Sequence, residues 1–212
     1  MRQLLLLPLL LVAVFSGAQT GVFTDERDGR QYKTIVIDGE KWFRENLRFQ
    51  TSKSFCPNYN KDSSDCRDGN YYSNSELSTV CPKGWHVATI PEWENYMRVL
   101  LKNHLINNGE LKYDSSDRLP NNGYAMQIDS AVLFNDTLLN LVATGWVEGL
   151  KLKRNQASSL WVIDTGGNDP KYHLHIGMKG FVKHSHEHHI FDKPRKIRKF
   201  PVRCVCETGS GE

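Results

Sequence analysis

The sequence predicts a disulfide-bonded α+β fold with short antiparallel strands, one principal helix and long loops. Two Asp-Gly turn signals bracket a segment rich in aromatic and β-branched residues, which is typical of antiparallel strands. A later segment combines an N-terminal capping pattern with apolar residues at helical spacing. Five cysteines in a chain that we expect to be exported favour disulfides.

Residues 1–18 have the features of a secretory signal peptide. Arg2 precedes an apolar run from Leu4 to Val14, and the small residues Ser16-Gly17-Ala18 follow. The run is shorter than the roughly 20 apolar residues that cross a bilayer as a helix. We therefore expect export to the periplasm, the cell surface or the medium, without a transmembrane segment in the mature chain. Residues 19–212 are expected to form one domain.

The first strands are expected on either side of the Asp-Gly pairs. Asp28-Gly29 and Asp38-Gly39 predict tight turns around the strand-like segment 32–37, and Trp42-Phe43 opens the next strand. Residues 48–80 and 110–130 are polar or turn-rich and are expected to be loops. The remaining strand candidates are 139–146, 160–163, 172–176 and 200–205.

The principal helix is expected to begin at Thr89. Thr89 and Glu92 fit a capping box, and Pro91 is tolerated in the first turn because its missing N–H removes no helical bond. Apolar residues then recur at helical spacing: Trp93, Tyr96, Met97, Leu100, Leu101 and Leu105. The sequence 107–109, Asn-Asn-Gly, predicts the end of the helix.

The cysteines suggest two disulfides and one extra thiol. Cys56 and Cys66 flank a polar, loop-like segment and are expected to close it. Cys81 needs a distant partner, and either Cys204 or Cys206 could serve, because residues two apart on a strand point to the same face.

Several blocks resemble one family, the Fibrobacter succinogenes major paralogous domain. They occur in the family's order and bracket nearly all of the mature chain: residues 23–34, Trp42 to Leu47, Cys81 to His86 with Pro91 to Trp93, and Pro201 to Val205. The resemblance implies a fold similar to the C-type lectin domain and to sulfatase-modifying enzymes. It also implies the pairs Cys81–Cys204 and Cys56–Cys66, with Cys206 as the extra cysteine. Such proteins are exported and often lie on the surface of Bacteroidetes-like bacteria, but the family implies no settled activity. The chain departs from the family's pattern at 160–165.

Histidines are abundant near the C-terminal end of the chain. At alternate strand positions they would share a face, and imidazoles so placed can bind zinc, nickel or copper. The candidate ligands are His173, His175, His184, His186 and His188. The alternative is an exposed polar hairpin end.

Aromatic residues provide a second candidate site. Trp146, Trp161 and Tyr172 are possible ligand platforms within the segment 114–193, and core packing is the alternative for each of them. Basic residues outnumber acidic ones between Lys171 and Arg203, which could favour acidic glycans or lipopolysaccharide, although a solvated strand surface explains them as well.

Motifs that carry catalysis are not recognisable. His186-Glu187 would need a histidine at position 190, which is Ile190, and neither a nucleophile elbow nor a P-loop occurs. No nucleic-acid module is visible. We therefore expect a secreted or cell-surface, non-catalytic binding or structural module for a glycan or protein. The alternatives are a histidine-rich metal-binding protein and a copper or thiol enzyme that uses Cys204 and Cys206.

Overall fold

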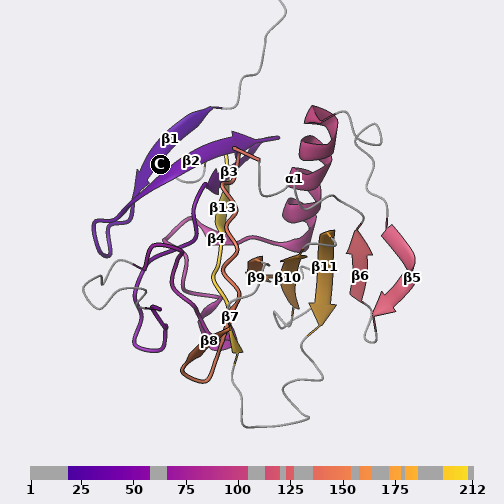
Figure 1. Ribbon diagram of the computed structural model, residues 1–212. Helices are drawn as coiled ribbons and strands as arrows, with labels where there is room; N and C mark the ends of the chain where they lie inside the picture. Colours follow the sequence, from indigo (N-terminus) through magenta and orange to yellow (C-terminus); the bar gives the residue numbers. More distant parts are fainter. Residues whose placement is uncertain are drawn as a thin grey trace, which may run out of the picture.

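Three β-sheets and one α-helix make up the described part of the chain (Figure 1). The computed structural model describes residues 19–57, 66–104, 113–119, 123–126, 136–153, 158–163, 172–177, 180–185 and 198–209. The expected signal peptide, residues 1–18, lies outside these ranges, as do His186 and His188.

The first sheet is antiparallel and has the strand order β1-β2-β3-β13-β4. Its strands are β1 (Thr20–Thr24), β2 (Gln31–Ile37), β3 (Glu40–Phe43), β13 (Cys204–Glu207) and β4 (His86–Val87). Asp38 and Gly39 join β2 to β3 with φ values of 49° and 85°, and Ile37 pairs with Glu40 across the turn. Positive φ at both central residues is what a type I′ hairpin requires, so the predicted Asp-Gly turn is confirmed.

The helix α1 (Ile90–Asn103) begins as its capping pattern predicts. The amide of Thr89 donates to Glu92 Oε2 at 2.6 Å, and the amide of Glu92 donates back to Thr89 Oγ1 at 3.4 Å. Its apolar stripe is buried through Trp93, Tyr96, Met97, Leu100 and Leu101. A short 3-10 turn, η1 (Asn74–Glu76), precedes it in the chain.

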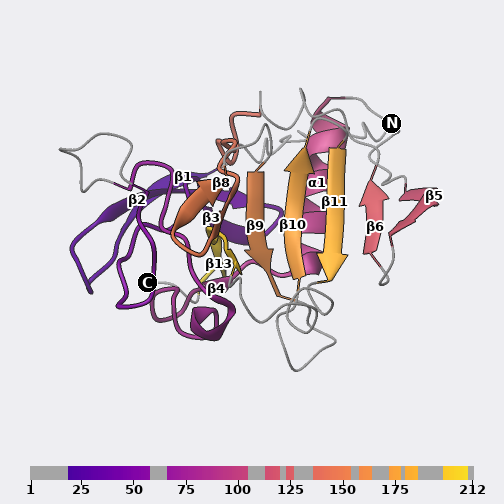
Figure 2. The ribbon, with the colours of Figure 1, turned by 60° about the horizontal axis from the view of Figure 1, so that its bottom comes forward.

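The second sheet has the order β5-β6-β11-β10-β9 and is antiparallel. Its strands are β5 (Tyr113–Leu119), β6 (Gly123–Met126), β11 (Gly180–Ser185), β10 (Tyr172–Gly177) and β9 (Ser158–Val162). Figure 2 shows α1 behind β10 and β11. Leu160 and Leu174 from this sheet belong to one apolar cluster with Trp93 of α1 and Trp42 of β3, so the helix shares a core with both large sheets.

The third sheet is small and has the order β12-β7-β8. It consists of β12 (Arg198–Lys199), β7 (Trp146–Glu148) and β8 (Lys151–Lys153). Gly145, next to β7, forms a parallel bridge with Ser158 at the start of β9. This bridge connects the third sheet to the second.

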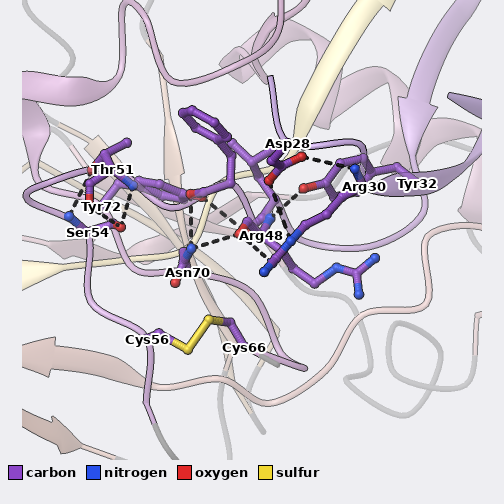
Figure 3. Close-up of a disulfide and its surroundings, with 12 residues drawn as sticks. Asp28, Arg30, Tyr32, Arg48, Thr51, Ser54, Cys56, Cys66, Asn70 and Tyr72 are labelled. Carbon is purple, nitrogen blue, oxygen red and sulfur yellow. Dashed lines mark hydrogen bonds and ion pairs between the residues drawn. A yellow bond between two sulfur atoms is a disulfide. The ribbon is translucent and has the colours of Figure 1, made fainter. Parts of the chain in front are cut away.

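Two disulfides hold the chain together, and they are the pairs that the family resemblance implies. Cys81 is joined to Cys204 across a sequence separation of 123, inside an aromatic cluster that includes Phe43 and Trp85. Cys56 is joined to Cys66 across a separation of 10. Figure 3 shows the hydrogen bonds around this second bridge: the Asn70 side-chain amide donates to the Arg48 and Phe49 carbonyls at 2.9 and 3.0 Å.

The predicted fold class is wrong. Instead of an α+β, C-type lectin-like domain, the described residues are mostly β-sheet with one α-helix and two disulfides. The error has a physical source in residues 113–126, which read as an irregular polar segment. They form β5 and β6 because β11, far along the chain, supplies the hydrogen-bonding edge for β6.

None of the helices in the described ranges has the length and apolar character needed to cross a membrane.

Candidate binding surface

Trp161, the second predicted aromatic platform, is a core residue. Its side chain is 3% exposed, and the indole Nε1–H donates to the Tyr72 carbonyl at 2.8 Å. Its ring packs edge-on against Phe200, with 4.9 Å between centroids. Both the polar end and the ring of Trp161 are therefore used inside the fold, which leaves no face for a ligand.

Trp146 lies at the surface, in contrast to Trp161. It begins β7 and is half-buried against the aromatic cluster. The third predicted aromatic residue, Tyr172, begins β10 on the second sheet, opposite Val162 and Ser185. The structure therefore puts Trp161 in the core and Trp146 at the edge of the same cluster, and it places Tyr172 by its register on β10.

The register of the third sheet gathers charged residues around Trp146. Trp146 lies opposite Lys153, and Glu148 lies opposite both Lys151 and Arg198. Directly opposite residues of antiparallel strands share a face, and residues two apart on a strand do as well. One face of the sheet therefore carries the following residues, which we call the basic–aromatic face: Trp146, Glu148, Lys151, Lys153 and Arg198.

The basic–aromatic face has an excess of positive charge. The Arg198 guanidinium lies 3.7 Å from the Glu148 carboxylate, and its carbon is 5.7 Å from the centroid of the Trp146 ring. Lys151 and Lys153 are exposed, and within the described part of the chain neither forms an ion pair. Their ammonium groups are thus available for an anion, and the ring beside them adds apolar surface.

Among the candidate histidines, the surroundings of the His173 side chain are described, and His175 and His184 are placed by strand register. His173 is 7% exposed and stacks on Phe200 with 4.5 Å between ring centroids, so it is a packed residue. In register it lies opposite His184, while His175 lies opposite Val182. The described residues contain no group of three or more histidine, cysteine or acidic side chains placed to hold a metal ion.

A carboxylate–histidine cluster occupies the start of the helix. His86 Nε2 lies 2.7 Å from Glu92 Oε1, and this hydrogen bond raises the pKa of His86. Burial alone would raise the pKa of Glu92, but the hydrogen bonds from His86 and Thr89 outweigh it and hold the pKa below its ordinary value. Glu92 is thus an ionised helix cap that is bound on both sides.

Glu40 is the most perturbed carboxyl group of this cluster. Burial, followed by the charge of Glu92, raises the pKa of Glu40 to about 7, against an ordinary value of 4.5. The Trp42 Nε1–H, 3.3 Å from Glu40 Oε2, only partly offsets this rise. The cluster therefore responds to pH near neutrality, although its hydrogen bonds serve to attach the helix to the first sheet.

Cys206 is a free thiol inside the protein. It is 1% exposed, and burial raises the pKa of its thiol. Cys204 is bonded to Cys81, so the pair of thiols that a copper enzyme would need is reduced to one. A buried thiol with a raised pKa is also a poor nucleophile, because the thiolate is the reactive form.

Residue order alone did not indicate the basic–aromatic face. The excess of basic residues that stands out in the sequence lies between Lys171 and Arg203, and Lys151 and Lys153 precede that stretch. The alternation Lys151-Leu152-Lys153 after Gly149 was the available signal, because it is typical of a hairpin strand with one charged face. The sequence around Glu40 did not indicate its raised pKa, because the rise depends on burial and on the charge of Glu92 in the helix.

The geometry defines a disulfide-bonded, mostly β protein with a basic surface sheet and a titratable helix cap. Comparison with protein families gives a more specific result. A family model described as the Fibrobacter succinogenes major domain matches residues 35–206 of the 212-residue chain. The chain therefore belongs to this family, as the motifs predicted. The searches of curated proteins and of solved structures give no match, and the C-type lectin-like expectation is not confirmed.

Proposed function

We propose that this protein is an exported, non-catalytic binding module that holds an acidic glycan on the basic–aromatic face. The observation that carries the proposal is the pairing of Trp146 with exposed Lys153, beside exposed Lys151, on one face of a small surface sheet. Ammonium groups attract carboxylate or phosphate groups of a glycan, and an indole ring offers apolar area to the C–H groups of a sugar.

A non-catalytic role is supported by how the titratable residues are used. Glu92 and His86 are bonded to each other at the helix start, and the only free thiol among the five cysteines, Cys206, is buried. Catalytic groups need access to a substrate and a pKa matched to proton or nucleophile transfer. Buried Cys206 meets neither requirement, and Glu92 and His86 are already bonded to each other at the helix start.

Export is supported by residues 1–18 and by the disulfides. Disulfide bonds persist in oxidising compartments and are rare in the cytosol. If the proposal holds, protein recovered from the periplasm, cell surface or medium begins near Gln19. Recovery of the chain with residues 1–18 intact from the cytosol would contradict it.

Titration with a uronic-acid polymer tests the binding proposal. Polygalacturonate should bind the exported protein, and neutral dextran should not. Charge reversal in Lys151→Glu/Lys153→Glu should weaken binding by about tenfold or more, because close like charges oppose the anion. The matched control is Lys33→Glu/Lys83→Glu, two exposed lysines outside the third sheet, which should leave affinity unchanged. Equal losses in the two double variants would refute the assigned surface, and a protein partner would then be sought.

A second candidate function is binding of zinc, nickel or copper. It is favoured by the register that puts His173 opposite His184 on adjacent strands. Each metal would be titrated while thermal stability is recorded. A stoichiometric shift that disappears in His184→Ala would support this function, and no shift with any of the three ions would reject it.

A further inference from the structure

The tip of the hairpin between β7 and β8 has an exposed leucine that the fold does not require. Gly149 and Leu150 form the two-residue turn, and Gly149 has a φ of 63°, which favours glycine. Leu150 has no such constraint, and its side chain is 86% exposed. Figure 1 shows this hairpin, in orange, at the lower edge of the molecule.

A ligand contact at Leu150 is indicated by its position beside the lysines, not by its exposure alone. Single exposed apolar residues are ordinary, and Val22 of β1 is another, at 62% exposure. Leu150, however, directly precedes exposed Lys151 at the end of the basic–aromatic face. An apolar group at a hairpin tip, followed by cations, can reach past a layer of negative charge into apolar material.

We infer that the partner is an anionic glycolipid, in which a negatively charged sugar headgroup is attached to acyl chains. Lys151 and Lys153 contact the charged headgroup, and Leu150 contacts the acyl chains beneath it. This inference rests on the proposed function, because it assigns the same face to the carbohydrate. A purely hydrophilic polymer would occupy the lysines and leave Leu150 in water.

The affinity ratio between intact and delipidated glycolipid measures the contribution of Leu150, and the salt dependence of binding measures the contribution of the lysines. Removing a leucine side chain from water typically increases affinity roughly ten- to hundredfold. Intact glycolipid should therefore bind at least about tenfold more tightly than its delipidated polysaccharide. Attraction by the lysines should act on both forms and should weaken as salt is added.

The experiment compares purified lipopolysaccharide with the polysaccharide released from it by removal of the acyl chains. Immobilised exported protein is used, with Leu150→Ser as the test variant and Val22→Ser as the matched control. Leu150→Ser should remove the preference for the intact form and leave polysaccharide binding unchanged. Val22→Ser should behave as wild type. Because Leu150 is exposed, its variant should unfold at the wild-type temperature, which checks that the fold is intact.

Each result has a distinct meaning. Equal affinity for the two forms, or a preference that survives in Leu150→Ser, would overturn the glycolipid inference and leave acidic-glycan binding in place. Failure of the protein to bind either form, or polygalacturonate, would reject the proposed function as well. Vesicles of phosphatidylglycerol without sugar complete the set: if they bind as tightly and with the same dependence on Leu150, the ligand is an anionic lipid surface and the glycolipid inference is wrong.

Discussion

At the residue scale, the Arg203 side chain links its own segment to those of Phe43 and Leu139. Its side chain is completely buried, and its Nη1 donates to the carbonyls of Phe43 and Leu139 at 3.1 and 2.8 Å. Burial lowers the pKa of Arg203 to about 10, so the guanidinium is still charged at neutral pH. Nearby, the Tyr96 hydroxyl donates to Asp136 Oδ2 at 2.7 Å. These bonds fix the 136–139 segment to the helix and the first sheet.

Replacement of Arg203 by methionine should destabilise the protein by about 2–4 kcal/mol. Two buried carbonyls would lose their donor, and each unsatisfied group costs about 1–3 kcal/mol before relaxation. Urea unfolding would measure the loss. Arg98→Met is the control, because Arg98 is exposed and forms only a surface pair with Glu94 at 3.8 Å; this change should cost less than about 0.5 kcal/mol. Similar losses in the two variants would contradict the role given to Arg203.

Glu40 should make stability depend on pH. Its folded pKa of about 7 lies above its ordinary value of 4.5, so the folded state binds more protons between these pH values. The contribution of Glu40 to stability should therefore fall as pH rises from about 4.5 to 7 and level off above that. His86, whose pKa is also raised, contributes in the same direction, while Glu92 contributes oppositely at acidic pH.

The variant Glu40→Gln isolates this effect. The amide cannot ionise, so the variant should gain more stability at pH 8 than at pH 5 relative to wild type. Unfolding in urea at the two pH values measures the difference. An identical change at both pH values would show that Glu40 titrates at its ordinary pKa in the folded protein.

At the scale of elements, the strands expected at 32–37, 160–163 and 172–176 are found as β2, β9 and β10, whereas β5 and β6 were not expected. The start of α1 and the Asp38-Gly39 turn follow from neighbouring residues alone, and both are confirmed. Residues 139–146 were expected to be a strand, but only Trp146 is in one. Asn140 has a φ of 48°, and the Asp136 carboxylate accepts the amides of Leu138 and Leu139, so this segment turns instead of pairing.

The two disulfides should contribute unequally to stability. In the chain-entropy account a bridge stabilises more when it closes a longer loop. The Cys81–Cys204 bridge spans 123 residues and the Cys56–Cys66 bridge spans 10. Loss of the first, as Cys81→Ser/Cys204→Ser, should cost about 5 kcal/mol, and loss of the second about 3 kcal/mol. Chemical unfolding of the two double variants tests this order, and a larger loss from Cys56→Ser/Cys66→Ser would contradict it.

At the scale of the whole molecule, the two large sheets and the helix form the core, and the third sheet carries the proposed function. The sequence placed Trp146 among the candidate contact residues but grouped it with Trp161, because residue type alone does not distinguish a surface ring from a core ring. Trp161 and His173 are buried by Phe200, which lies far along the chain. The charged partners of Trp146 emerge only from the strand register.

Lysine footprinting would test the central claim, that the basic–aromatic face binds an acidic glycan, most directly. The exported protein would be treated with an amine-reactive reagent with and without polygalacturonate, and modification would be read by mass spectrometry. The account predicts protection of Lys151 and Lys153, with exposed Lys33 and Lys83 unchanged. Protection of Lys33 and Lys83 while Lys151 and Lys153 stay reactive would show that the glycan binds elsewhere.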